Sequence, residues 1–164
     1  MTIYLKNKHT LEVGDFFFKC AIGKNGLSIN KVEGDKKTPR GHFDIGSLYY
    51  RKDRIKIPKT SIKNIKIKPK MGWCDDINVP EKYNKLIKTN QNIHHEKLYR
   101  KDNKYDLLLP IKYNEKKRIP GKGSCIFIHL TKNYAPTAGC IVLKKKDFLI
   151  MLRIIKKNTK IKIS

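Results

Sequence analysis

The chain has 164 residues, with 38 Lys and Arg against 14 Asp and Glu, which gives a formal net charge of +24. A chain of this length buries enough apolar surface for its own hydrophobic core, so we expect a single domain over residues 1–164 that needs no metal or disulfide. The four cysteines, Cys20, Cys74, Cys125 and Cys140, lie at least fifteen residues apart. This spacing excludes a CxxC zinc knuckle and a dense disulfide framework.

The sequence shows neither a membrane-spanning segment nor a signal peptide. Its longest apolar stretch, residues 148–155, is interrupted by Arg153 and is much shorter than the ~20 residues that span a bilayer. The first residues do not combine a basic segment, an apolar segment and a small-residue cleavage site. We therefore expect no membrane association and a cytoplasmic location, or a periplasmic one if a leader has been removed.

The positive charge leaves a basic nucleic-acid-binding domain as one alternative, because such a surface attracts polyanions by releasing counterions. Composition weakens this alternative. Lysines number 32 against six arginines, and isoleucines number 22 against four valines, a skew that A+T-rich codon usage produces by itself. The lysines are scattered along the chain without a recognition-helix, finger or RNA-binding motif, so we expect no specific nucleic-acid partner.

The predicted elements are mostly strands, because Gly and Pro punctuate short segments rich in Ile, Leu, Phe and Tyr. The pair Asn25-Gly26, after the second strand, indicates a hairpin, since type I′ turns need positive φ at both central residues. A short helix is expected over residues 94–99, and a clearer one over about 145–156, where apolar residues recur at helical spacing. The pattern predicts a mainly β fold with one or two short helices. The expected strands cover residues 2–6, 16–22, 41–50, 62–68, 105–113, 125–131, 139–143 and 159–163.

A histidine and a cysteine near the C-terminus are the pair of residues best suited to catalysis. His129 lies near the end of one expected strand and Cys140 at the start of the next, with a loop between them. A cysteine beside a base is an activated nucleophile for acyl transfer. Gly139 lets the backbone approach a substrate closely, and successive amides there can form an oxyanion hole. The alternative is that Cys140 is a small core residue and His129 a strand-edge histidine.

Two motifs occur in order along the chain: residues 34–43 read GDKKTPRGHF, and residues 137–141 read TAGCI. They resemble the lead-in Gly-Asp-x-x-Thr-Pro-x-Gly-x-Phe and the signature [Ser/Thr]-x-Gly-Cys-[Ile/Val] of the YkuD family, the L,D-transpeptidase catalytic domain. Residues 72–76, 95–99 and 113–114 resemble a small signal-less branch of the same family. The resemblance therefore covers nearly the whole chain.

The resemblance implies a β-sandwich-like fold and a reaction that needs no cofactor. A cysteine attacks the L-to-D peptide bond of a peptidoglycan stem tetrapeptide, between its third residue and the terminal D-Ala. Carried onto this sequence, Cys140 is the nucleophile and His129 is its general base, with a pKa near neutrality. The amides of Gly139 and Cys140 would hold the oxyanion.

Three positions depart from the commoner family pattern. Ala138 stands where many members have a second His, and Val142 replaces a frequent Arg. Leu130 follows His129 in place of Gly or Ser, so that position offers no side chain to orient the imidazole. We expect a backbone carbonyl, such as that of Leu130, to accept the hydrogen bond from the ring.

The implied substrate carries charges of both signs, because a stem tetrapeptide ends in a carboxylate and usually contains diaminopimelate with an ammonium and a carboxylate. Acidic residues would meet the ammonium, arginines would meet a carboxylate, and aromatic rings would form a wall. Each role has an ordinary structural alternative: core packing for the tryptophan, a turn cap for the acids and a solvated surface for the arginines. The expected substrate-binding residues are Trp73, Asp75, Asp76, Tyr113, Asn114, Thr137, Arg40 and Arg51.

The expected function is cysteine-dependent L,D-acyl transfer, in which a thioester forms and D-Ala leaves. With water as acceptor, the protein is an L,D-carboxypeptidase of muropeptide recycling. With an amine of another stem peptide, it is a cross-linking L,D-transpeptidase. The expected cytoplasmic location favours hydrolysis. The expected partners are stem peptides or muropeptides, and the sequence sets no oligomeric state; a non-catalytic peptidoglycan-binding module is the remaining alternative.

Overall fold

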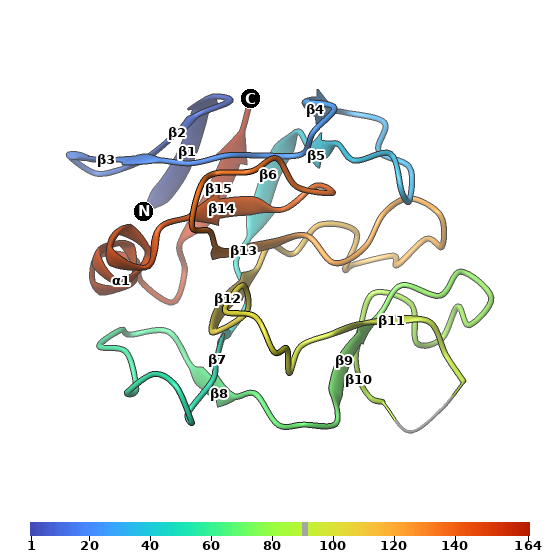
Figure 1. The fold of residues 1–164 in the computed structure, drawn as a ribbon. Helices are drawn as coiled ribbons and strands as arrows, with labels where there is room; N and C mark the ends of the chain where they lie inside the picture. Colours follow the sequence, from blue (N-terminus) through green and yellow to red (C-terminus); the bar gives the residue numbers. More distant parts are fainter. Residues whose placement is uncertain (90–91) are drawn as a thin grey trace.

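The structure is a computed structural model that describes residues 1–89 and 92–164, and in these residues it is mainly β with a single α-helix (Figure 1). Two five-stranded sheets pack around a shared hydrophobic core, as in a β-sandwich. In the described part of the chain, no helix is long and apolar enough to cross a membrane. The mainly β fold class predicted from the sequence is confirmed.

The first sheet joins the two ends of the chain. It comprises β1 (Thr2–Asn7), β2 (Thr10–Val13), β3 (Phe16–Lys19), β6 (Gly41–Asp44) and β15 (Lys160–Ile163). Its strand order is β3-β2-β1-β15-β6, and β1 and β15 run parallel to each other at its centre. The N-terminal and C-terminal strands therefore lie side by side (Figure 1).

The second sheet has the order β14-β13-β12-β7-β8. It comprises β7 (Leu48–Tyr50), β8 (Asn64–Lys66), β12 (Leu107–Pro110), β13 (Phe127–Leu130) and β14 (Ile141–Leu143). Two smaller pairings complete the β structure. They are a three-stranded sheet of β9 (Met71–Cys74), β10 (Leu86–Lys88) and β11 (His95–Lys97), called the small sheet below, and the pair β4 (Leu27–Ser28) and β5 (Thr38–Pro39).

Three strands of the second sheet, β12, β13 and β14, are buried on both faces, and they read as nearly continuous apolar runs: LLLP, FIHL and IVL. Successive side chains of a strand point to opposite faces. Ile128 and Leu130 of β13 accordingly belong to the main core between the two large sheets. Phe127 belongs to a second, smaller core together with Trp73 of the small sheet and Cys140. The face of the second sheet that points away from the first sheet thus carries the candidate nucleophile.

The helix α1 (Lys145–Ile154) ends two residues before the predicted boundary. Its buried residues Phe148, Met151 and Leu152 follow the predicted apolar stripe and join the main core. Ile155 adopts an extended conformation, which ends the helix, and its side chain remains buried. The helix predicted over about 145–156 is therefore confirmed.

The short helix predicted over residues 94–99 is wrong. This segment contains β11, which pairs antiparallel with β9 and places Glu96 opposite Trp73. Six residues form too short a helix to be stable by propensity alone, whereas pairing with β9 satisfies the backbone groups along its length. The sequence analysis also missed β2, β4, β5, β9 and β10.

The strand predicted over residues 41–50 is two strands in different sheets. β6 pairs with β15 of the first sheet, whereas β7 pairs with β12 and β8 of the second. The chain crosses between the sheets at Gly46, where a Cβ atom would lie 3.2 Å from Pro110. The hairpin predicted at Asn25-Gly26 is also wrong, because β4, which follows the turn, pairs in parallel with β5.

Candidate active site

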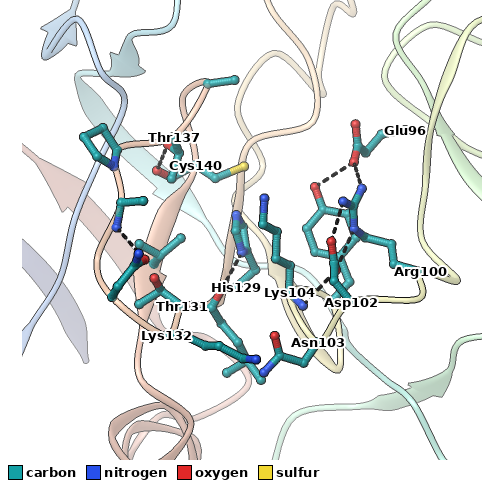
Figure 2. Close-up of a pocket in the computed structure, with 17 residues that line it drawn as sticks. Glu96, Arg100, Asp102, Asn103, Lys104, His129, Thr131, Lys132, Thr137 and Cys140 are labelled. Atoms are coloured by element: carbon teal, nitrogen blue, oxygen red, sulfur yellow. Dashed lines mark hydrogen bonds and ion pairs between the residues drawn. The ribbon is translucent and has the colours of Figure 1, made fainter.

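The strand register brings His129 and Cys140 to one face of the second sheet. β13 and β14 run parallel, with His129 opposite Val142. Cys140 precedes Val142 by two residues, so the side chains of all three lie on the same face. All three line one cavity, and Figure 2 shows the imidazole of His129 pointing toward the sulfur of Cys140.

The imidazole of His129 is held by the backbone. Its Nδ1 lies 3.0 Å from the carbonyl oxygen of Leu130, which can only accept a hydrogen bond. Nδ1 therefore carries the proton, and the neutral ring presents an unprotonated Nε2 toward the cavity. The edge of Tyr105 packs against the ring at a centroid distance of 5.1 Å. The backbone orienter expected at Leu130 is confirmed.

Burial decides the charge state of His129, a residue that is only 7% exposed to solvent. Burial lowers the pKa of His129 to about 4, although the hydrogen bond to the Leu130 carbonyl acts in the opposite direction. The positive charges of Lys104 and Arg100 lower this pKa further. The expectation of a pKa near neutrality is corrected: the ring is a neutral base throughout the physiological range.

The thiol of Cys140 is also neutral at rest. Burial raises the pKa of Cys140 to about 12, against a lowering by the hydrogen bond from the Phe127 amide. The sulfur donates to the carbonyl oxygen of Cys125 at 3.2 Å and accepts from the Phe127 N–H at 3.4 Å. A neutral thiol therefore faces a neutral imidazole, and the ring is able to accept the thiol proton.

The turn that precedes the nucleophile is tied by Thr137. Its hydroxyl donates to the Cys140 carbonyl oxygen at 2.6 Å and accepts from the Gly139 N–H at 3.0 Å. The Gly139 amide, expected to hold an oxyanion, is therefore already engaged inside the turn. Of the two amides expected to hold an oxyanion, only that of Cys140 remains a candidate.

The upstream motif packs directly against this turn. Gly139 has a φ of +144°, and a Cβ atom there would lie 2.8 Å from the Lys37 carbonyl oxygen, so only glycine fits. The hydroxyl of Thr38 donates to the Gly139 carbonyl oxygen at 2.7 Å and accepts from the Gly23 N–H at 2.9 Å. The Thr-Pro motif thus fixes the backbone just before Cys140.

Replacing Thr38 with Val should destabilise the protein and slow its reaction together. Val keeps the shape of Thr but leaves the buried Gly139 carbonyl and Gly23 amide without their partner, which costs about 1–3 kcal/mol of unfolding free energy. Urea unfolding measures this loss, and the alkylation rate of Cys140 measures the effect on the turn. Thr38→Ser keeps the hydroxyl and should behave like the wild type. Equal stability of the Val and Ser variants would contradict this role.

The cavity that contains Cys140 and His129 has a volume of about 530 Å³ and a strongly charged wall. Arg100 pairs with Asp102 through two hydrogen bonds of 2.7 and 2.9 Å and with Glu96 at 3.1 Å. The Tyr105 hydroxyl donates to the same oxygen of Glu96 at 3.0 Å. Figure 2 shows this network beside Cys140 and His129, with Lys104 and Lys132 also lining the cavity.

Comparison with protein-family models assigns residues 1–163 to the YkuD L,D-transpeptidase catalytic domain. The chain belongs to the YkuD family. Comparison with curated proteins and with solved structures gave no match. The likeness inferred from the two sequence motifs is therefore confirmed over essentially the whole chain.

In this YkuD domain, Thr137 alone among the eight predicted substrate-binding residues belongs to the described lining of the Cys140 cavity. Trp73 is buried in the smaller core, with its ring edge-on to Tyr49 and Phe127. Its indole N–H donates to Asn84 at 3.0 Å. The ring therefore packs against Phe127 of the strand that carries His129, and it does not line the Cys140 cavity.

The two predicted arginines also lie elsewhere. Arg51 is buried and pairs with Asp53 through two hydrogen bonds of 2.7 and 2.8 Å. It also donates to the Arg100 carbonyl oxygen at 2.6 Å and packs over the ring of Tyr99. Arg40 is exposed, and its amide pairs with the β4 backbone. Arg51 thus positions the segment that carries Arg100 in this YkuD domain.

The remaining predicted residues organise loops. Asp75 lies 2.6 Å from the ring of His94, and Asp76 accepts from the backbone amides of Asn78 and His94. This arrangement is the turn cap that the sequence left open as an alternative. Tyr113 donates to a backbone carbonyl of the loop at residues 119–123. Asn114 binds the same loop through three further hydrogen bonds.

Sequence reasoning missed the charged wall formed by Glu96, Arg100 and Asp102. Residues 95–99 resemble a branch of the family, and this resemblance was a signal that the segment belongs to the site. The sequence analysis assigned the segment to a helix and predicted no site residue in it. In the structure, β11 carries Glu96 beside the second sheet, and Tyr105 links it to the ring of His129.

Proposed function

We propose that this protein catalyses cysteine-dependent acyl transfer from stem tetrapeptides, with Cys140 as nucleophile and His129 as general base. Membership of the YkuD family assigns the chain the broader activity, an L,D-transpeptidase-type reaction related to peptidoglycan. One observation carries this proposal: the register of β13 and β14 directs both side chains into a single cavity, where the Leu130 carbonyl leaves Nε2 of His129 free to accept a proton.

In the proposed reaction, the Cys140 sulfur attacks the carbonyl carbon of the peptide bond between the third residue and D-Ala, and the thiol proton passes to Nε2 of His129. The Cys140 amide donates to the oxyanion that forms. The imidazolium returns the proton to the leaving amine, D-Ala departs, and the acyl group remains as a thioester on Cys140.

We propose water as the second reactant, which makes the protein an L,D-carboxypeptidase. A cavity of about 530 Å³ suits one short peptide, whereas a cross-linking reaction must seat a second stem peptide as well. His129 would deprotonate the water, which attacks the thioester, and the proton returns to the Cys140 sulfur as the tripeptide leaves.

Mass spectrometry of a disaccharide-tetrapeptide incubated with the protein tests this proposal. Loss of D-Ala supports hydrolysis. Exchange of D-Ala for an added amine, without the hydrolysed product, contradicts hydrolysis and supports the transpeptidase reaction. Absence of any change in the peptide contradicts acyl transfer altogether and favours a non-catalytic binding module.

A cytoplasmic location is part of the same proposal, because free muropeptides and water are available there and the polymeric wall acceptor is not. Deletion in the cell should leave tetrapeptide-bearing intermediates in the soluble fraction. The sacculus should keep its cross-links. Recovery of the native protein from the periplasm, or loss of cross-links between third residues, would contradict this location and outcome.

The lysines of the cavity are candidates for the carboxylates of the substrate, in place of the two arginines predicted from the sequence. We expect Lys132→Gln to raise the KM for the tetrapeptide about tenfold with little change in kcat, because a lost ground-state contact weakens binding before and during reaction alike. Steady-state kinetics measures this effect. Lys66→Gln, on the exposed part of β8, is the matched control. An unchanged KM for Lys132→Gln would assign the carboxylates to other groups.

A further inference from the structure

Lys31 is a buried lysine close to the candidate nucleophile. Its side chain is 2% exposed, and it is the one lysine buried in the part of the chain that the structure describes. A lysine ammonium is almost never buried unless it is paired, because its transfer from water is costly. A charge retained in this position needs a physical explanation.

The partner of Lys31 is Asp35, which lies four residues later in the same loop. Nζ donates to Oδ1 of Asp35 at 2.6 Å. The same carboxylate accepts from the backbone amides of Val32 and Lys37 at 2.9 and 2.8 Å. Burial raises the pKa of Asp35, but these hydrogen bonds outweigh it and hold the pKa below its usual value. Asp35 is therefore ionised, and Lys31 is held as its charged partner.

The ammonium lies against the glycine that precedes Cys140. A Cβ atom on Gly139 would lie 3.5 Å from Nζ of Lys31, and one on Gly123 would lie 2.8 Å from its Cε. Both positions are glycines with positive φ, so the backbone leaves room for the lysine to pass. Burial is the largest influence on the pKa of Cys140 and raises it; the Lys31 charge is a smaller influence and lowers this pKa, in the direction that favours the thiolate.

We propose that Lys31 is a positioning residue whose buried ammonium stabilises the negative charge that develops at Cys140 during attack. The inference rests on Cys140 being the nucleophile of the proposed function. Asp35 pairs with the ammonium and fixes its direction, and the side chain passes beside Gly139 in the turn before Cys140. A purely structural role, in which the ion pair only pins the loop, predicts no electrostatic effect on the sulfur.

Alkylation of Cys140 separates these two roles. Iodoacetamide and iodoacetate are of similar size and both react with the thiolate, but only iodoacetate is anionic. In Lys31→Met, which removes the charge and keeps the length, we expect iodoacetamide to react with Cys140 about tenfold more slowly. The iodoacetate rate should fall by a further several-fold, because the positive field acts on the reagent too. Peptide mapping assigns the label to Cys140.

Lys36→Met, in the same loop but exposed, is the control and should match the wild type. If Lys31→Met does not fold, the double variant Lys31→Met/Asp35→Asn removes the charge without leaving a carboxylate unpaired, and it should show the same two changes. An unchanged iodoacetamide rate, or an equal loss with both reagents, would overturn the proposal. These rates need no peptide substrate, so a wild type that alkylates normally but does not turn over the tetrapeptide refutes the proposed function alone.

Discussion

Cys140→Ser should lose nearly all turnover of a disaccharide-tetrapeptide, by on the order of a thousandfold or more. Cys140 lies between the Cys125 carbonyl and the Phe127 amide, at the start of a strand whose register aims it at His129. A serine hydroxyl in the same place is a far weaker nucleophile, because an alcohol is much less acidic than a thiol and gives up its proton to the imidazole less readily. Release of D-Ala, followed by mass spectrometry, measures the loss.

Cys20→Ala is the control for this prediction, because Cys20 is a buried thiol of the main core. It should retain turnover, and its intact mass should still increase when a slow acylating substrate analogue is added. Cys140→Ala should show no such increase. Retention of more than about a tenth of the activity by Cys140→Ser would move the nucleophile to another residue.

His129→Gln should slow formation of the thioester by about 10²–10⁴-fold, which is the usual contribution of a general base. It should also remove the acidic limb of the pH profile. Since burial holds the pKa of His129 at about 4, the wild-type rate should be flat through neutrality and fall only toward pH 4. Single-turnover acylation across pH 3.5 to 8 measures the limb. A limb near neutrality, or one that persists in His129→Gln, would assign the proton transfer to a different group.

The same pKa makes stability depend on pH with a definite sign. His129 has a pKa of about 4 when folded and about 6.5 when unfolded, so the unfolded chain binds more protons between these values. The neutral state of His129 therefore contributes about 3 kcal/mol to the unfolding free energy above about pH 6.5. This contribution is lost as the pH falls toward 4. Urea unfolding at pH 7 and pH 4.5 should show this loss in the wild type and a smaller one in His129→Gln.

The candidate catalytic pair, Cys140 and His129, was accessible from the sequence because it depends on local order along the chain. A His near the end of one strand and a Gly-Cys pair at the start of the next become neighbours whenever the two strands pair in parallel. The glycine requirement at residue 139 and the hydroxyl at Thr38 belong to motifs that were also recognised from the sequence. The physical reasons are visible only in the structure: the Lys37 backbone approaches Gly139 too closely for a side chain, and the Thr38 hydroxyl binds the turn before Cys140.

The walls of the cavity depend on contacts between distant segments, which no local pattern reports. Glu96 reaches the site because its segment pairs with β9, and six residues contain too little periodicity to distinguish that strand from a helix. Arg51 reads as a surface arginine, yet it is buried because Asp53 and the ring of Tyr99 replace its solvent. Trp73 reads as a possible wall, yet the second sheet covers it.

The sequence by itself determined the mainly β class, the helix near residue 145, the family and the two residues best placed for chemistry. These features rest on periodicity, turn residues and short motifs, which act over a few neighbouring residues. Only the tertiary structure decided the charge state of the pair, the engaged amide of Gly139, the charged wall and the buried ammonium of Lys31. Each of these depends on how much water is excluded and on which distant groups replace it, and both quantities are properties of the packed molecule.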